Sequence, residues 1–246
     1  MREAHMRDYE QETRVRVAFI QTVIKAAGAR GIVFGASGGK DSVLVGILCK
    51  KACDDTVGII LPCDCKRNYE DDRYDALDAC DKYGIKVRTV DLGEVKQTIV
   101  SALDRGGPLT NAADINIAPR LRMTALYAIA ASESRLVAGT SNRSEIHMGY
   151  FTKWGDGACD FNPIADLTVT EIYEFLTYLK APEKIIDKMP SGGLFDGQTD
   201  ESEMGITYKS IDDFILTGET NETDQAIIAR YHAASEHKRS LPAVYS

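Results

Sequence analysis

A glycine-rich segment near the start of the chain has the residue types of a phosphate-binding loop. It reads Gly35-Ala36-Ser37-Gly38-Gly39-Lys40-Asp41-Ser42 and lies between a β-rich run at residues 32–34 and a helical pattern at residues 42–53. Glycines let the backbone bend tightly and approach an anion, and the first N–H groups of the following helix point at that anion. The two serines add hydroxyl donors. We therefore expect this loop to bind phosphate groups at the end of a strand.

The loop fails two common nucleotide-binding patterns and resembles a third. With Gly39-Lys40 aligned on the Walker A pattern, Phe34 stands where the first glycine belongs and Asp41 stands where the hydroxyl belongs. The G-x-G-x-x-G dinucleotide pattern fails too. The remaining pattern, S-G-G-x-D-S, resembles the pyrophosphate loop of the ATP pyrophosphatase superfamily, which holds the β- and γ-phosphates that leave together. A carboxylate beside phosphates needs a divalent cation between them, so we expect Asp41 to bind Mg²⁺.

A second polar segment, residues 139–160, follows another predicted strand and is dense in groups that bind rather than pack. Its candidate binding residues are Glu145, Lys153, Asp156 and Asp160. The glutamate can complete a magnesium site with Asp41, the lysine can meet a phosphate or carboxylate, and the aspartates can bind hydroxyls or a cation. A solvated polar loop is the plain alternative. Apolar and aromatic residues in the middle of the segment argue against it.

Four stretches of the chain resemble the NAD synthetase family. Residues 139–157 read G-T-S-N-R-S-E-I-H-M-G-Y-F-T-K-W-G-D-G, which is similar to the family's G-T-S-N-R-S-E-x-x-x-G-Y-x-T-x-W-G-D-G. Residues 116–123 and 200–212 are similar to its N-I-x-x-R-x-R-M and D-E-x-E-x-G-x-x-Y-x-x-I-D segments. Residues 237–239 resemble its C-terminal H-K-R. The resemblance runs over residues 32–242 and so covers nearly the whole chain.

The resemblance implies a ligase for the last step of NAD biosynthesis. In such enzymes the carboxylate of nicotinic acid adenine dinucleotide (deamido-NAD) attacks the α-phosphate of ATP, and pyrophosphate leaves. Ammonia then attacks the acyl-adenylate, which releases AMP and NAD⁺. Because the substrate supplies its own nucleophile, the protein needs only to position two nucleotides, neutralise the pyrophosphate and exclude water. The resemblance also implies a homodimer.

The resemblance further implies roles for single residues. The glycine-rich loop cradles the ATP phosphates, and Asp41 and Glu145 hold Mg²⁺. Thr140 and Ser191 fall at ATP-contacting positions, and Asp156 matches the aspartate near ammonia. The positions that contact deamido-NAD are Arg120, Lys153, Asp160, His237 and Lys238.

Two points stay open in this assignment. Val169 stands where the family often has a lysine that contacts ATP, so either Lys40 or Lys180 compensates or ATP binds more weakly. Arg120 and Arg122 lie two positions apart, so they point to different faces of one helix and only one is expected to reach the ligand.

The elements that must position these residues follow from the apolar pattern. Helices are expected at residues 9–27, 42–53, 93–103, 119–132, 168–179 and 208–239, with a further helix ending near residue 83. Strands are expected at residues 32–34, 56–61, 86–90 and 136–139. This alternation predicts an α/β fold with a doubly wound, mainly parallel sheet flanked by helices. The resemblance of the glycine-rich loop further implies the adenine nucleotide α-hydrolase-like fold of the ATP pyrophosphatase type. Residues 190–199, with three glycines, are expected to form a lid ordered by substrate.

Composition narrows the class further. The chain has 246 residues and a net charge of −8, which argues against nucleic-acid partners and so against tRNA-modifying thiolases or lysidine synthetases of the same superfamily. A non-catalytic nucleotide sensor is a second alternative, although it would not need both magnesium carboxylates. No apolar run approaches a membrane span, and the N-terminus lacks the pattern of a signal peptide. The six cysteines form no C-x-x-C pair, which fits a reducing cytoplasm.

The chain is expected to be a single synthetase domain over residues 1–246. The synthetase-like pattern begins by residue 32, which leaves far less chain before it than the ~100 residues a glutamine-hydrolysing domain usually takes. None of the cysteines lies in a recognisable nucleophile motif either. We therefore expect free ammonia as the nitrogen donor.

Overall fold

Four parallel strands form the centre of the molecule in a computed structural model that describes residues 7–63, 66–191 and 199–245. The strands are β1 (Gly31–Gly35), β2 (Thr56–Ile60), β3 (Lys86–Thr89) and β4 (Arg135–Val137), in the spatial order β3-β2-β1-β4. β1 pairs with β2 from Ile32↔Thr56 and with β4 from Gly31↔Arg135. The parallel sheet that the alternating pattern predicted is confirmed.

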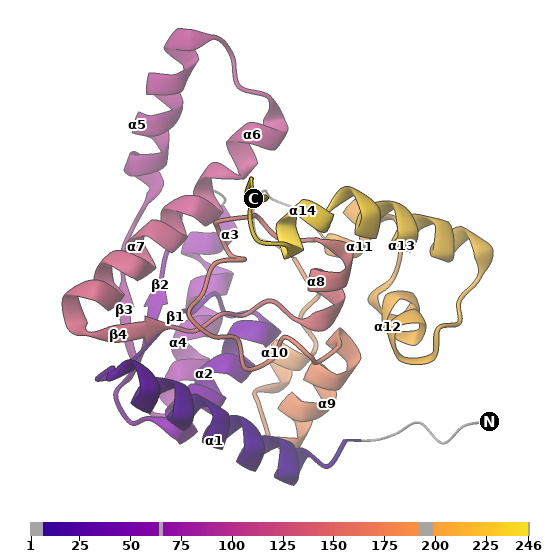
Figure 1. Ribbon diagram of the computed structural model, residues 1–246. Helices are drawn as coiled ribbons and strands as arrows, with labels where there is room; N and C mark the ends of the chain where they lie inside the picture. The colour runs from indigo at the N-terminus through magenta and orange to yellow at the C-terminus, as the bar shows by residue number, and fades with distance from the viewer. Residues whose placement is uncertain (1–6, 64–65, 192–198, 246) are drawn as a thin grey trace.

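The path of the chain through the sheet reverses beside β1. It runs outward from β1 to β2 and β3, and then crosses back to place β4 on the other side of β1 (Figure 1). At such a reversal the loops after the two neighbouring strands diverge and leave a crevice for a ligand. The glycine-rich loop follows β1 and the polar segment 139–160 follows β4, so both predicted binding segments reach this crevice.

The helices agree closely with the expected pattern. In the described residues they are α1 (Tyr9–Ala27), α2 (Lys40–Ala52), α3 (Lys66–Tyr69), α4 (Asp71–Lys82), α5 (Gly93–Leu103), α6 (Asn111–Ile115), α7 (Ile117–Glu133), α8 (Arg143–Met148), α9 (Val169–Tyr178), α10 (Glu183–Ile186), α11 (Asp200–Met204), α12 (Tyr208–Thr217), α13 (Glu222–Ala234) and α14 (Glu236–Arg239), with a 3₁₀ turn at Asp104–Gly106. The helical region expected at residues 208–239 divides into three helices. Gly218, at φ 80°, ends α12 in the left-handed conformation that glycine adopts readily.

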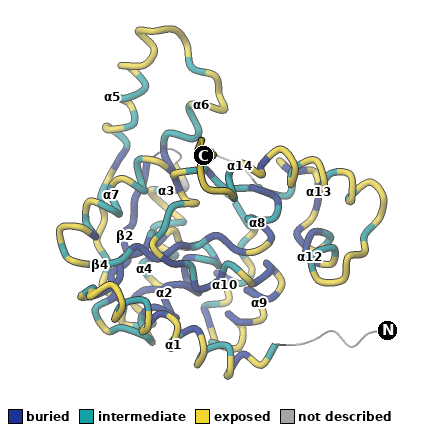
Figure 2. The backbone as a smooth tube through the Cα atoms, viewed as in Figure 1, coloured by how far each residue is buried: buried dark blue, intermediate teal, exposed yellow. Residues whose placement is uncertain are grey.

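Alternate side chains of the strands enter two separate cores. Ile32 and Phe34 of β1 pack with α1, α2, α4 and α9, whereas Val33 packs with α7 on the opposite face. Both cores lie at the dark blue centre of Figure 2. Because successive residues of a strand point to opposite faces, a continuous apolar run of this kind is buried on both sides. The sheet is therefore a rigid platform for the loops at its carboxyl edge.

A third apolar cluster joins the C-terminal helices to α8 and α9. Its buried members are Met148, Val169, Met204, Ile206, Tyr208, Ile211 and Ile228. Figure 1 shows α12 and α13 beside α8, at a distance from the sheet. This cluster holds the C-terminal segment over the segment that follows β4.

Helix α5 projects from the body of the protein together with α6 (Figures 1 and 2). None of the residues of α5 is buried, and Val95 and Leu103 are about half exposed. The lid expected at residues 190–199 lies mostly outside the described residues. In the part of the chain that the structure describes, no helix combines the length and the apolar character needed to cross a membrane.

Candidate active site

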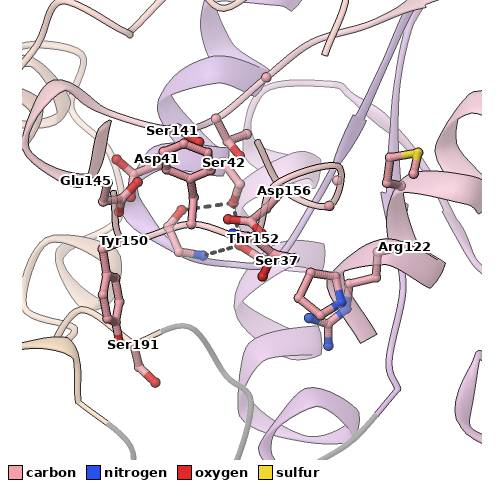
Figure 3. Close-up of a pocket in the computed structure, with 18 of the residues that line it drawn as sticks. Ser37, Asp41, Ser42, Arg122, Ser141, Glu145, Tyr150, Thr152, Asp156 and Ser191 are labelled. Atoms are coloured by element: carbon pink, nitrogen blue, oxygen red, sulfur yellow. Dashed lines mark hydrogen bonds between the residues drawn. The ribbon is translucent and has the colours of Figure 1, made fainter. Parts of the chain in front are cut away.

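A pocket of about 590 Å³ opens at the carboxyl ends of β1, β2 and β4. The glycine-rich loop, the segment after β2, one face of α7 and the segment after β4 form its walls, and Lys238 of α14 closes one side. Figure 3 shows Asp41 and Glu145 at one end of the pocket and Arg122 at the other, with Asp156 between them. The crevice expected from the strand order is thus lined by groups from both predicted binding segments.

The glycine-rich loop directs the N-terminus of α2 into the pocket. Gly38 has φ 72°, and a Cβ atom there would lie 2.4 Å from the carbonyl oxygen of Asp72, so only glycine fits. Ser37 donates to Ser42 Oγ at 3.0 Å, which ties the loop to the first turn of the helix. The helix cap, Gly39, makes no side-chain capping bond. The first N–H groups of α2 therefore remain free to bind an anion.

Two carboxylates meet at the side of the pocket nearest α2 and α8. Asp41 lies in the first turn of α2, Glu145 lies in the first turn of α8, and both side chains are largely buried. Burial and the neighbouring charge of Asp41 raise the pKa of Glu145 well above its usual range. Lys40 lies between them, with Nζ 2.7 Å from Asp41 Oδ2 and 3.8 Å from Glu145 Oε1. A buried pair of like charges needs a cation, and the lysine ammonium supplies one here.

The donor set fits a hard cation that also binds phosphate. Carboxylate oxygens are ligands that Mg²⁺ prefers, and Mg²⁺ is usually held by one or two carboxylates together with substrate phosphates and water. Among the described residues, no group of three or more histidine, cysteine, aspartate or glutamate side chains gathers as a ready metal site. We therefore expect a cation at Asp41 and Glu145 to take further ligands from a bound nucleotide and from water, as Mg²⁺ usually does.

Asp156 is held by a tight turn at the floor of the pocket. Its Oδ1 accepts from the Thr152 backbone N–H at 2.9 Å, and Trp154, at φ 61°, lies in the left-handed conformation between them. Asp156 is exposed and lines the pocket, but nearby protein atoms displace part of the water around its carboxylate, and this desolvation raises its pKa. Such a group can bind a small cation or accept a proton.

The residues predicted to contact the acceptor divide into three groups. Lys238 lines the pocket and donates to the carbonyl oxygens of Gly149 and Phe151, at 2.9 and 2.8 Å. Arg120, Lys153 and His237 form a chain of contacts on an exposed rim beside it, in which Arg120 reaches the Lys153 carbonyl and Lys153 Nζ reaches the His237 carbonyl.

Asp160 lies apart from the other predicted acceptor residues and does not line the pocket. Its Oδ2 accepts from the Val137 N–H at 2.7 Å, and its Oδ1 accepts from Tyr127 at 3.3 Å. In this structure the side chain thus holds the end of β4 and a residue of α7.

The structure also places the residues left open by the sequence. Lys180 is exposed beyond the end of α9, whereas Lys40 is buried in the pocket wall. Arg122 lines the pocket, where it donates to the Leu61 carbonyl at 3.0 Å and to Asn68 Oδ1 at 2.9 Å. Its neighbour Arg120 faces solvent on the rim.

A helical period would have distinguished these two arginines before the structure was known. The residues of α7 that line the pocket are Pro119, Arg122, Met123 and Leu126, which are spaced as one face of a helix.

Lys188 is a pocket residue that the sequence analysis did not identify. It lies on the wall between Asp72 and Asp75, in a segment whose sequence shows no helical or strand period.

The fold and the site define an α/β enzyme of the adenine nucleotide α-hydrolase type, with a glycine-rich loop and a carboxylate pair at the reversal of a parallel sheet. The family model described as NAD synthase matches residues 12–245, so the chain belongs to the NAD synthase family. The NH(3)-dependent NAD(+) synthetase of Carboxydothermus hydrogenoformans is 46% identical over 240 residues, which are 96% of this chain and 98% of that protein. The family resemblance seen in the motifs is confirmed.

Two solved structures resemble this one over almost their whole length. The NMN synthetase from Francisella tularensis has a TM-score of 0.92 and 34% identity, covering 97% of this chain and 99% of that one. The NH3-dependent NAD synthetase from Campylobacter jejuni has a TM-score of 0.79 and 30% identity, covering 98% of this chain and 100% of that one. The protein is thus an ATP-consuming ligase of the NAD synthetase type.

Proposed function

We propose that this enzyme amidates deamido-NAD with ammonia and converts ATP into AMP and pyrophosphate. The observation that most supports this proposal is that the free N-terminus of α2 and the Asp41–Glu145 pair face one pocket at the reversal of the sheet. A helix N-terminus binds phosphate oxygens, and the carboxylates suit a cation shared with those phosphates. The relatives named NH(3)-dependent NAD(+) synthetases support the same reaction. Residues 1–246 serve as one synthetase domain in this proposal.

The first half of the proposed reaction is the transfer of AMP to the acceptor carboxylate. The glycine-rich loop and α2 receive the phosphates of ATP, and Asp41 and Glu145 hold Mg²⁺. When bound, that ion neutralises charge on the departing pyrophosphate. Thr140 and Ser191 line the same pocket, where their hydroxyls can bind the nucleotide. The acceptor approaches from the side of Lys238 and the rim formed by Arg120, Lys153 and His237, where cationic groups attract its phosphates.

The second half of the proposed reaction is attack by ammonia on the acyl carbon. Asp156 binds the ammonium ion at the pocket floor and helps to remove its proton, because a carboxylate with a raised pKa is a better base. Activity at fixed total ammonium is expected to rise with pH toward the ammonium pKa. Asp156→Asn is expected to weaken apparent ammonium affinity and to lower turnover, and a variant unchanged in both would remove this role from Asp156.

A second candidate acceptor is nicotinic acid mononucleotide. The structural match to the NMN synthetase from Francisella tularensis has the higher TM-score, 0.92 against 0.79 for the Campylobacter NAD synthetase. Amidation of the mononucleotide would use the same bonds, since the reacting carboxylate is the same in both acceptors. The two candidates differ only in whether an adenylate half must be accommodated outside the reacting centre.

One experiment separates these acceptors. The purified enzyme is mixed with Mg-ATP, ammonium and either deamido-NAD or nicotinic acid mononucleotide, and the products are identified by mass spectrometry. We expect the higher kcat/KM with deamido-NAD, together with AMP and pyrophosphate. A higher kcat/KM with the mononucleotide would favour the second candidate. Formation of ADP and orthophosphate would contradict adenylation with either acceptor.

The enzyme is also proposed to be a cytoplasmic homodimer. The five cysteines among the described residues are free thiols, which supports a reducing compartment. The apolar residues exposed on the projecting helix α5, Val95 and Leu103, favour contact with a second copy. Sedimentation analysis at micromolar concentration is expected to give a mass of twice 27.0 kDa. Val95→Glu combined with Leu103→Glu is expected to yield the monomer.

A further inference from the structure

Lys40 is a buried lysine placed where the proposed function requires a metal ion. It is the first residue of α2, and its side chain is 6% exposed. Its ammonium contacts both carboxylates of the pair and lies 5.5 Å above the centre of the Tyr208 ring. A lysine is almost never buried in this way unless its charge is compensated.

The four carboxylate oxygens of the pair are divided between two partners. Asn142 binds one oxygen of each carboxylate, since its Nδ2 donates to Asp41 Oδ1 at 3.0 Å and its backbone N–H donates to Glu145 Oε2 at 3.2 Å. The other two oxygens, Asp41 Oδ2 and Glu145 Oε1, face the ammonium of Lys40. A cation that took these two oxygens would occupy the place of the lysine.

Besides the carboxylate pair, the surroundings of Lys40 include the ring of Tyr208 and the carboxylate to which that tyrosine donates. Its ammonium contacts the carboxylates of Asp41 and Glu145, which compensate its charge in this buried position. On its other side, Tyr208 belongs to an apolar cluster that includes Val169. Asp200 also lines the pocket, and the Tyr208 hydroxyl donates to it at 3.0 Å. An ammonium displaced from the pair therefore has two kinds of anionic partner at the pocket, this carboxylate and the phosphates of a nucleotide, where these are proposed to lie.

We propose that Lys40 is a built-in counter-ion, which pairs with Asp41 and Glu145 while the pocket is empty and gives way to a divalent cation when a nucleotide enters. Its ammonium then pairs with phosphate oxygens. The proposal rests on the proposed function for the use of a metal–nucleotide complex. Its consequence is that metal and nucleotide bind together far better than the metal binds alone, because the nucleotide provides the displaced lysine with a new partner.

The test measures binding of Mn²⁺ to the full chain by calorimetry and electron paramagnetic resonance, in the absence of acceptor and ammonia. Titrations are made with and without α,β-methylene-ATP, which cannot release pyrophosphate. The variants are Lys40→Met and, as a second replacement of similar length, Lys40→Gln. Lys184→Met is the matched control, because Lys184 pairs with Asp75 and Asp78 but does not line the pocket.

Without nucleotide, Lys40→Met and Lys40→Gln are expected to bind Mn²⁺ at least tenfold more tightly than the wild type or the Lys184→Met control. The nucleotide analogue is expected to raise Mn²⁺ affinity at least tenfold in the wild type and less than threefold in the Lys40 variants. Thermal unfolding supplies a second readout, since Mn²⁺ alone should stabilise the Lys40 variants more than the wild type.

Two results would overturn the proposal. One is Mn²⁺ affinity in both Lys40 variants no higher than in the control, and the other is wild-type Mn²⁺ affinity that does not depend on the nucleotide analogue. The comparison of Mn²⁺ affinity with and without the nucleotide analogue uses the wild type alone, so it tests the proposal even where the Lys40 variants fail to fold. Neither measurement involves amide formation, and so a failure here is distinguishable from a failure of the proposed reaction.

Discussion

Asn142 donates from Nδ2 to Asp41 Oδ1 at 3.0 Å, although the two residues are 101 positions apart in the chain. The Oδ1 atom of the same side chain accepts from the Glu145 N–H at 2.9 Å and caps α8. One buried amide therefore orients the Asp41 carboxylate in the first turn of α2 and the helix that carries the other carboxylate. Asn142 is a positioning residue, and it joins the two segments at the reversal of the sheet.

Replacement of Asn142 is expected to separate these two effects. Asn142→Ser keeps a helix cap but is too short to reach Asp41, so kcat/KM for ATP should fall about tenfold with most stability retained. Asn142→Ala should lose the same activity and, in addition, about 1 kcal/mol of the free energy of unfolding that a cap contributes. Steady-state kinetics and urea unfolding measure the two quantities. Wild-type kcat/KM for ATP in the serine variant would show that the bond to Asp41 has no positioning role.

The two carboxylates of the pair should act as one unit. Asp41→Asn and Glu145→Gln each remove a charge from the same proposed cation site, so each should lower pyrophosphate release at least a hundredfold. The double variant should be little worse than the more damaged single variant, because effects within one site are not additive. Circular dichroism checks that the fold is kept. Losses that simply multiply in the double variant would argue for two independent roles.

The two arginines of α7 should have different effects on the reaction. Arg122 lines the pocket and is fixed by Leu61 and Asn68, whereas Arg120 lies on the exposed rim. Arg122→Met is expected to lower kcat at least tenfold, since the pocket loses a guanidinium that Leu61 and Asn68 hold in position. Arg120→Met is expected to raise KM for the acceptor several-fold with kcat nearly unchanged. The reverse pattern in kcat and KM would place the acceptor-binding arginine inside the pocket.

His147 should make the stability of the protein depend on pH. Burial and the nearby charges of His232, Arg239 and Arg143 lower the pKa of His147 to about 4. Between pH 6.5 and about 4 the unfolded chain holds more protons at this residue than the folded chain, so the free energy of unfolding falls as the pH falls. After allowance for screening by solvent at this partly buried position, the contribution is about 1 kcal/mol.

The pH effect can be measured by urea unfolding of the wild type and His147→Gln at pH 7.5, 5.5 and 4.5. The difference between the two proteins at pH 7.5 gives the packing contribution of the ring, which contacts His232 and Phe214. Toward pH 4.5 the variant should lose less stability than the wild type. Parallel curves for the two proteins would mean that His147 has the same proton affinity in both states.

Much of the fold and part of the site could be predicted from local patterns in the sequence. Apolar runs of strand length alternate with helical periods, and these are set by the backbone geometry of a few neighbouring residues. The spacing of the glycine-rich loop between residues 35 and 42 is likewise a local property, and it was enough to predict that this loop binds phosphate. Its position at the carboxyl end of a strand also followed, because the loop comes directly after the strand expected at residues 32–34.

Contacts between distant segments were decided only by the tertiary structure. The packing of α7 on β1 and β4 selects Arg122 rather than Arg120 for the pocket, and the approach of β4 to β1 brings Asn142 onto Asp41. The sequence left open whether Lys40 or Lys180 compensates for Val169 at the ATP-contacting position, because both are lysines close to segments that resemble the family. Only the folded chain surrounds Lys40 with two carboxylates in a buried wall, where the loss of water makes their pairing necessary.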